Sequence, residues 1–349
     1  MNSELVFFGA FALFVVLMLA IDLGLFHKKD TAVSLAQAGI MSAVWVSFAI
    51  AFYFFLKTEG QQLHNINDQA RLTEIVANYQ HNITINSANF QENLNHYNDN
   101  LSLEFITGYV VEYALSVDNI FVMVLIFSAF AVDEKYYHRV LFWGILGAVF
   151  LRFFFIFIGA TLISQFGWIL YLFGAFLIYS GGMMFFSKEE DEEIDTKNHK
   201  VVKFASKYFS VHPEFVGNKF FHKVNGKRFI TPLFLVLLIV EFTDVVFAVD
   251  SIPAIFAVTK DPYIVFFSNI FAILGLRSMF FLLVNVIDKF HYLKTGLAVL
   301  LVFIGVKMLA HYWLSDWGFT TVHSLFVILG ILTTSVVASL VFPKKQKAK

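Results

Sequence analysis

The sequence predicts an all-α polytopic membrane protein with about nine transmembrane helices, six of which form an inverted three-plus-three helix repeat. Of its 349 residues, 58% are hydrophobic and only 15% are charged, and the mean hydropathy is +0.70. This is more apolar surface than the core of a soluble domain can bury. The spacing of the apolar runs gives the number of helices, and two similar acidic motifs indicate the repeat.

Nine segments reach the length of about 20 apolar residues that is needed to cross the hydrocarbon core of a bilayer. We expect them near residues 4–26, 35–56, 103–130, 138–162, 165–186, 230–258, 263–286, 292–312 and 320–342. The first segment lacks the basic start and the small-residue cleavage site of a signal peptide, so it is interpreted as a retained helix.

The distribution of Lys and Arg predicts the orientation. Most basic residues fall in connections on one side of the predicted helices, together with the C-terminal KKQKAK, whereas the opposite side carries only Lys57, Arg71 and Lys260. Because basic connections stay on the cytoplasmic side, the N-terminus is expected outside and the C-terminus in the cytoplasm.

Hydropathy and charge divide the chain into six segments. They are two N-terminal transmembrane helices (1–56), a polar external loop (57–100), a first three-helix repeat (101–186), a charged cytoplasmic loop (187–229), a second three-helix repeat (230–312), and the last transmembrane helix with a basic tail (313–349). The Asn-rich external loop is interpreted as weakly structured or capping. Metal capture by its histidines His64, His81 and His96 is the alternative.

Two acidic motifs stand at corresponding places in the two repeats. EYALSVDNI (112–120) and DVVFAVDSI (244–252) each place an acid six residues before a second aspartate. An ionisable side chain at membrane depth costs about 2.5–3.5 kcal/mol, so a repeated pair of them predicts a functional site, here for a cation.

The similarity between the repeats extends beyond these motifs. Leu151-Arg152 in the fourth predicted helix matches Leu276-Arg277 in the seventh, and paired glycines relate the fifth helix to the eighth. Because each unit has three helices, the second unit enters the membrane with inverted topology. Repeats of this kind build transporters whose sites lie at interrupted helices near the midplane, and Pro253 is expected to provide the interruption beside Asp250.

Helical geometry leaves two alternatives for the paired acids. Residues six apart are about 9 Å apart along a helix and about 240° apart around it. Either the helix unwinds so that Glu112 and Asp118 reach one cation, or only one member of each pair binds it. Glu241 and Asp244 are three residues apart and should share a face.

Charge and ligand chemistry narrow the predicted ion. Five acids at membrane depth (Glu112, Asp118, Glu241, Asp244 and Asp250) face three charge-balancing bases (Arg152, Arg277 and Lys307). The two remaining negative charges match a divalent cation, although the acids could instead pair with the bases or be protonated. Carboxylates flanked by Asn119 and Ser251, without cysteine, are hard donors suited to magnesium, calcium or manganese.

At these residues the chain resembles the TerC family of integral membrane proteins, and most closely its Alx branch. The resemblance includes MLAIDLGLF, GYVVEYALSVDNIFV, IVEFTDVVFAVDSIPAIFAVT and DPYIVFFSNIFAILGLRSMFFLL. It implies an inverted-repeat exporter associated with manganese and with tellurium resistance, in the inner (plasma) membrane of a bacterium. The implied site positions are Glu112, Asp118, Asp244 and Asp250, with Asp22 as a gate or relay candidate alongside Glu241.

The resulting prediction is manganese(II) efflux from the cytoplasm by alternating access, with no resident cofactor. The expected partners are the manganese cargo, the lipid bilayer and protons as counter-ion, with no nucleic acid. We do not expect an enzyme, because no nucleotide-binding loop, zinc-protease helix or activated nucleophile is present in the sequence. The alternative is a membrane scaffold for metal or tellurite stress-response partners, without transport of its own.

Overall fold

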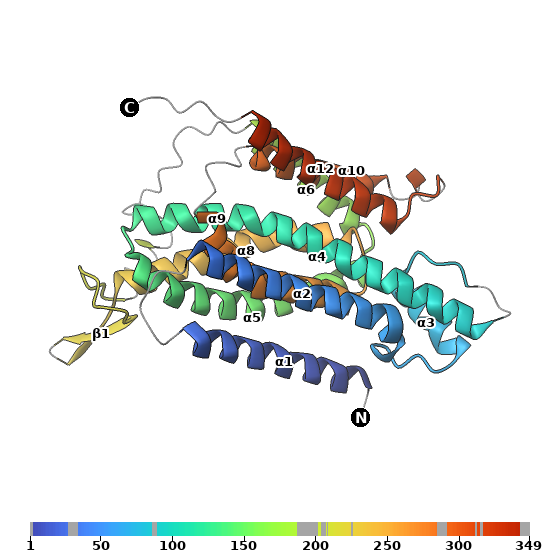
Figure 1. Ribbon diagram of the computed structural model, residues 1–349, viewed down its shortest axis with the longest axis horizontal. Coiled ribbons are helices and arrows are strands. Elements are labelled where there is room, and N and C mark those ends of the chain that lie inside the picture. Colours follow the sequence, from blue (N-terminus) through green and yellow to red (C-terminus); the bar gives the residue numbers. More distant parts are fainter. Residues whose placement is uncertain are drawn as a thin grey trace.

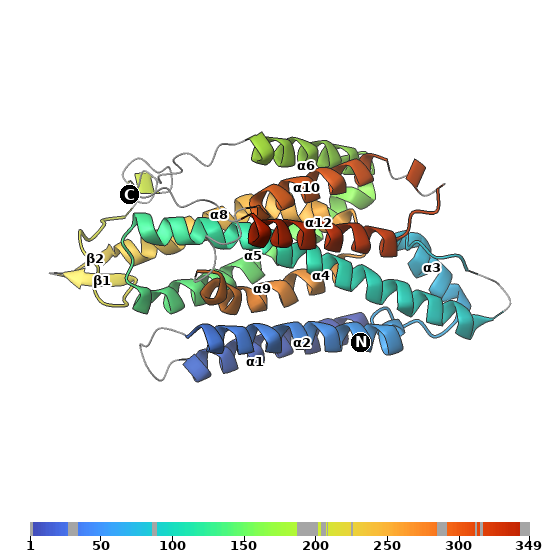
Figure 2. The same ribbon diagram turned by 45° about the horizontal axis from the view of Figure 1, so that its top comes forward.

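The computed structural model describes residues 3–26, 34–85, 89–186, 202–203, 207, 209–224, 226–284, 292–310, 313–314 and 317–342. Its long helices run roughly alongside one another, with α1 and α2 at one side of the bundle and α6, α10 and α12 at the other (Figures 1 and 2). A two-stranded antiparallel hairpin is formed by β1 (Phe221–Val224) and β2 (Lys227–Ile230). All the other named elements in the described part of the chain are helices, as the sequence predicts.

Each of the nine predicted helices has a counterpart. They are α1 (Ser3–Phe26), α2 (Leu35–Glu59), α4 (Phe90–Ala129), α5 (Tyr137–Gln165), α6 (Ile169–Phe186), α8 (Pro232–Phe256), α9 (Pro262–Val284), α10 (Leu293–Leu309) and α12 (Thr321–Val341). Seven helices among the described residues are long and apolar enough to cross a membrane. The apolar part of α1 and the 17-residue α10 are shorter than this limit.

The polar segment after α2 is largely helical. It forms the short helix η1 (Gly60–Gln62), the helix α3 (Gln69–Tyr79) and the first turns of α4, which starts well before the predicted residue 103. The prediction of weak structure is therefore wrong for the described residues, and the capping alternative fits. We call residues 60–85 the cap; α3 lies beside the N-terminal part of α4 (Figure 1).

The helices of the two proposed repeats pack in crossed pairs. Helix α4 packs against α9 and α8, α5 packs against the same two helices, and α6 packs along α10. Helices α6 and α10 approach closely at Gly174 and Gly305, where each glycine lies against the backbone carbonyl of the other, so a methyl group on Gly305 would be only 2.6 Å from that oxygen. Small residues allow such close contact, which matters in a bilayer because lipid tails are as apolar as the helices.

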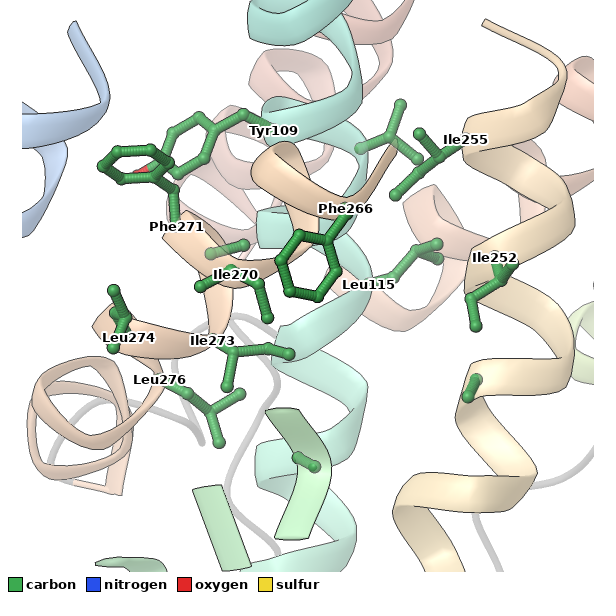
Figure 3. Packing of buried hydrophobic residues seen from close by; sticks show 14 of the residues in the cluster. Tyr109, Leu115, Ile252, Ile255, Phe266, Ile270, Phe271, Ile273, Leu274 and Leu276 are labelled. Atoms are coloured by element: carbon green, nitrogen blue, oxygen red, sulfur yellow. The ribbon is translucent and has the colours of Figure 1, made fainter. Parts of the chain in front are cut away.

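Helix α9 is the most enclosed of these helices, and the apolar core forms around it. Ile252 and Ile255 of α8 lie near Leu115 of α4 and Phe266 and Ile270 of α9 (Figure 3). Dense van der Waals packing of this kind, rather than escape from water, holds membrane helices together.

Helix α8 runs without a break from Pro232 to Phe256, with Pro253 inside its last turn. The predicted interruption beside Asp250 is therefore not present in this structure. Proline removes one amide donor and its ring crowds the carbonyl of the preceding turn, and the helix ends within one turn of it, at Phe256.

Candidate cation site

The guanidinium of Arg152, on α5, is the centre of a polar cluster inside the bundle. Its side chain is completely buried, and it contacts one residue from each of the three other central helices. Those residues are Glu112 of α4, Asp244 of α8 and Asn269 of α9. Four helices therefore meet at one cation supplied by the protein itself.

The contacts of Arg152 are specific to single atoms. Nη1 donates to Oε1 of Glu112 and to Oδ1 of Asn269, and Nη2 donates to Oδ1 of Asp244 at 3.2 Å. Asn269 is held in turn by its own Nδ2, which donates to the Val265 carbonyl at 3.0 Å. Charge-assisted hydrogen bonds of this kind are stronger than neutral ones, and they fix the orientation of the carboxylates.

Each of the two carboxylates keeps one oxygen without a partner. Oε2 of Glu112 and Oδ2 of Asp244 are buried and have no hydrogen-bond partner in the described part of the chain. Buried carboxylate oxygens are normally paired, so unpartnered ones require an explanation. Two acids share one guanidinium, and their free oxygens could accept a cation or a proton.

The first acidic motif does not converge on this cluster as a whole. Helix α4 is unbroken, so Glu112 and Asp118 point in different directions, as the second geometric alternative predicts. Asp118 is half-buried and makes contacts within the described chain, while Asn119 is 4% exposed. The structure therefore brings Glu112, but not Asp118, to Arg152.

The second motif behaves similarly. Asp244 is 6% exposed and reaches Arg152, whereas Asp250 is half-buried and its Oδ1 has no hydrogen-bond partner among the described residues. The hydroxyl of Ser251 is buried and has no partner among the described residues. The two acids that meet at Arg152, Glu112 and Asp244, are the first residues of the two acidic motifs.

The remaining predicted residues lie apart from Arg152. Glu241 is half-buried beside Asp244, but its carboxylate faces Gly147 and an apolar pocket between α1, α5, α8 and α9. Arg277 is buried in α9 and has partners of its own. Lys307 of α10 is half-buried and interacts with Glu104 rather than with the central acids. Asp22 lies in α1, but its side chain is outside the described residues.

Asn269 is the site residue that the sequence analysis missed. It is a single amide in an apolar helix, eight residues before Arg277, and the first repeat shows no matching amide. Its burial at 0% exposure is the structural evidence for its role, because a buried amide needs a partner and finds it in Arg152. A lone asparagine inside DPYIVFFSNIFAILGLR was the available signal.

A second cluster of buried charged groups joins the cap to the bundle. Nε2 of His64 is 2.9 Å from Oδ2 of Asp261, and Nδ1 of His81 is 3.0 Å from Oε2 of Glu104. Both histidines come from the cap, Glu104 belongs to α4, and Asp261 precedes α9. The histidine pairs therefore connect two regions far apart in the sequence.

Both carboxylates of this second cluster are fully occupied. Glu104 also accepts from the Thr259 hydroxyl at 2.6 Å and from the Asn100 amide at 2.7 Å. The other oxygen of Asp261 accepts from the Tyr263 amide at 2.9 Å, which caps the start of α9. Two of the three histidines predicted as alternative metal ligands, His64 and His81, are thus engaged with carboxylates instead, and the third, His96, is exposed.

The two histidine pairs shift the ionisation of their members. Burial lowers the pKa of His81, but the neighbouring Glu104 carboxylate raises it, and the net shift is upward. Burial raises the pKa of Asp261, but His64 lowers it, and the net shift is downward. Both shifts favour the charged forms, as expected for ion pairs that hold two segments together.

Within the described ranges, no three His, Cys, Asp or Glu side chains are close enough to hold one metal ion. Glu112 and Asp244 both contact Arg152, which stands between them. Chemically, the cluster can hold one internal cation and release it only if another positive charge replaces it.

The sequence matches a known protein family and several known proteins. Residues 97–347 match the model of the integral membrane protein TerC family. A protein of Photorhabdus laumondii described as "Putative membrane-bound redox modulator Alx" is 44% identical over 86% of this chain and 85% of its own length. A protein of Escherichia coli with the same description is 41% identical, over 94% and 92% respectively.

An uncharacterized membrane protein of Myxococcus xanthus is 42% identical over 95% of this chain and 91% of its own length. No solved structure matches. The family match and the relatives cover both acidic motifs and all the central helices. The chain is therefore a multi-pass membrane protein that belongs to the TerC family.

Proposed function

We propose that this protein exports divalent cations, with manganese(II) as the main cargo, from the cytoplasm of a bacterium across its inner membrane. The observation that carries the proposal is the buried pair Glu112 and Asp244, which begin the two acidic motifs, share a single guanidinium and each retain a free oxygen. Intramembrane acids of this kind mark ion pathways.

Arg152 suggests how such a site would release its cargo. Two carboxylates carry two negative charges, so a divalent ion between them is neutralised only when the guanidinium moves away. Arg152 and the cargo therefore compete for the same oxygens. In this mechanism Arg152 holds the acids while the site has no cargo, and its return displaces the ion.

The other predicted ligands would complete the coordination in the cargo-bound conformation. Asp118 with Asn119, and Asp250 with Ser251, lie one to two turns along α4 and α8 from the acids at Arg152. Manganese and magnesium prefer about six oxygen ligands, which Glu112 and Asp244 alone do not supply. We propose that repacking of α4 and α8 brings these groups, or water, to the ion.

The crossed packing of helices supports the inverted repeat in this proposal. In such a repeat a two-fold axis relates α4 to α8, α5 to α9 and α6 to α10. A contact between α4 and α9 then requires a contact between α8 and α5, and both contacts are present. We propose that all nine long helices cross the membrane, α10 as a short span, with the N-terminus outside and the C-terminus in the cytoplasm. Protons are the proposed counter-ion, because the same carboxylates can carry them.

A second candidate follows from the printed description of the relatives as redox modulators. This chain contains no cysteine, so it cannot act through thiol and disulfide exchange of its own. A redox effect would then follow indirectly, either from metal export or from a scaffold that gathers stress-response partners. We favour export because a scaffold does not need buried carboxylates with free oxygens, and we propose a transporter rather than an enzyme.

The deciding experiment is efflux of radioactive manganese from cells that lack their other manganese exporters. The protein is compared with Asp244→Asn and with Asp99→Asn, a matched change at an acid that is about half exposed. We expect efflux by the protein and by Asp99→Asn, and none by Asp244→Asn at equal abundance. Equal efflux by all three would refute a role for the Arg152 cluster, and no efflux by any would favour another ion or the scaffold.

A further inference from the structure

The apolar pocket beside Glu241 is a separate feature from the Arg152 cluster. It has a volume of about 570 Å³ and is lined by residues of α1, α5, α8 and α9. This volume lies within the range of about 300–1,000 Å³ that is typical of small-molecule sites. Its surface is almost entirely apolar, and Glu241 is the one ionisable residue among those that line it.

Aromatic rings form the wall of this pocket. Phe8, Phe153 and Phe266 pack in mutual contact, with ring centroids 5.2–5.8 Å apart. Trp143 and Phe150 line the pocket from α5 and are exposed on the surface of the bundle. Faces of aromatic rings attract cations, and the attraction is strongest where water is excluded.

Glu241 supplies the charge at this aromatic wall. Its Oε2 is buried and has no hydrogen-bond partner among the described residues. Its carboxylate lies directly against Gly147, at a position that the side chain of any other residue would occupy. The absence of a side chain at Gly147 thus leaves room for the carboxylate at the pocket.

The depth of Glu241 limits what can reach it. It lies nine residues after Pro232, the first residue of α8, which corresponds to about 13 Å along the helix axis. If the start of α8 lies at the surface of the bilayer, the ammonium group of a phospholipid head group would not reach this carboxylate. A free amphiphilic molecule that dissolves in the bilayer would reach it.

We propose that this pocket binds lipophilic organic cations, with the positive charge paired to Glu241 and the apolar body against the rings of Phe8, Phe153 and Trp143. The site takes one class of ligand: amines or onium ions that carry aromatic or branched apolar groups. It is independent of the ion that the Arg152 cluster handles. Glu241 is a neighbour of Asp244, so the pocket lies next to the Arg152 cluster. A molecule bound in the pocket is therefore positioned to interfere with that cluster.

The test uses two probes of the same shape and opposite charge, tetraphenylphosphonium and tetraphenylborate. Each is titrated into the full chain in lipid nanodiscs, and binding is followed by equilibrium dialysis with empty nanodiscs as background. Glu241→Gln is expected to weaken phosphonium binding by about ten-fold or more, since it removes the ion pair. The borate should bind no better than to empty nanodiscs.

A second variant tests the pocket without changing any residue of α8. Ala12 of α1 is exposed and lines the pocket, so Ala12→Phe should fill it and weaken phosphonium binding without altering Glu241. Phe185→Ala, at an exposed ring of α6 away from the pocket, is the matched control and should bind normally. Equal binding of both probes, or phosphonium binding unchanged in Glu241→Gln and Ala12→Phe, would overturn the proposal.

Discussion

The two buried charge clusters of this protein contain similar residues but are satisfied to different degrees. At the cap, Glu104 and Asp261 each have a histidine partner, and all four of their oxygens accept hydrogen bonds. At the centre, Glu112 and Asp244 share Arg152, and one oxygen of each is free. Acids whose oxygens are all paired make a structure rigid, whereas acids with a free oxygen can exchange partners. The difference supports the proposal that the first cluster stabilises the fold and that the second binds the cargo.

The largest expected effect follows from removal of Arg152. Arg152→Gln leaves two buried carboxylates without a cation, which should lower the free energy of unfolding by about 3–5 kcal/mol. Adding Glu112→Gln should restore part of the stability, since only Asp244 then lacks a cation, but not manganese efflux. Thermal unfolding of the purified variants, followed by tryptophan fluorescence, measures the stability, and efflux of radioactive manganese measures the transport. If Arg152→Gln alone were as stable as the parent, the guanidinium would not be the counter-charge of these acids.

At the cap, Glu104→Gln should have a smaller effect of a different kind. It weakens the hydrogen bonds to His81, Thr259 and Asn100, and should cost about 1–3 kcal/mol of stability. Efflux per folded molecule should persist, because Glu104 does not contact the Arg152 cluster. Glu112→Gln is the matched change and should remove efflux. The comparison between the clusters fails if Glu104→Gln abolishes transport in a protein that remains folded.

The pH dependence of the cap provides a third test. The pKa of His81 is raised in the folded state, so its contribution to stability is complete below its ordinary pKa and is lost as the pH rises through the folded value. The pKa of Asp261 is lowered, so its contribution is complete above its ordinary pKa and is lost as the pH falls through the folded value. The cap should therefore be most firmly docked in mildly acidic solution and should loosen at alkaline pH.

The groups that face His81 set this response, and they can be tested one at a time. They are Glu104 of α4, Asp261 before α9, His64 of the cap, and the rings of Tyr79 and Tyr97; Lys307 of α10 acts through Glu104. The rate of hydrogen–deuterium exchange of residues 60–85 should rise between about pH 6 and pH 9, two values that lie on either side of the ordinary histidine pKa. The rise should exceed the increase that unprotected amides show over the same range. His81→Gln should remove most of that rise. An unchanged rise in this variant would exclude His81 as its source.

The sequence predicted the helices well because a bilayer imposes a length on apolar runs. All nine windows correspond to helices, and the largest error is the start of α4, which begins at Phe90 instead of residue 103. The extra turns lie among polar residues such as Asn95 and His96, where there is no apolar run to mark them. The helices of the cap were missed for the same reason, since their stability depends on a few contacts such as His81 with Glu104.

The candidate site could be predicted by residue type but not by arrangement. Buried acids in equivalent motifs identified Glu112 and Asp244, and the count of charges suggested Arg152 as a balancing group. Sequence alone could not show that Arg152 forms ion pairs with both acids, because this depends on how α5 faces α4 and α8. Asn269 was missed because its role depends on that same packing.

The smallest effect is expected at the surface pair of Lys57 and Asp99. Their charged groups are 3.5 Å apart, and about half of each side chain is exposed to solvent. An exposed pair of this kind contributes about 0–1 kcal/mol, because water screens the charges and both side chains lose mobility when they pair. Asp99→Asn should thus leave both thermal stability and manganese efflux close to those of the parent, and added salt should reduce even the small difference. A loss as large as that of Glu104→Gln would mean that charge near the cap, rather than complete pairing of buried groups, stabilises this end of the bundle.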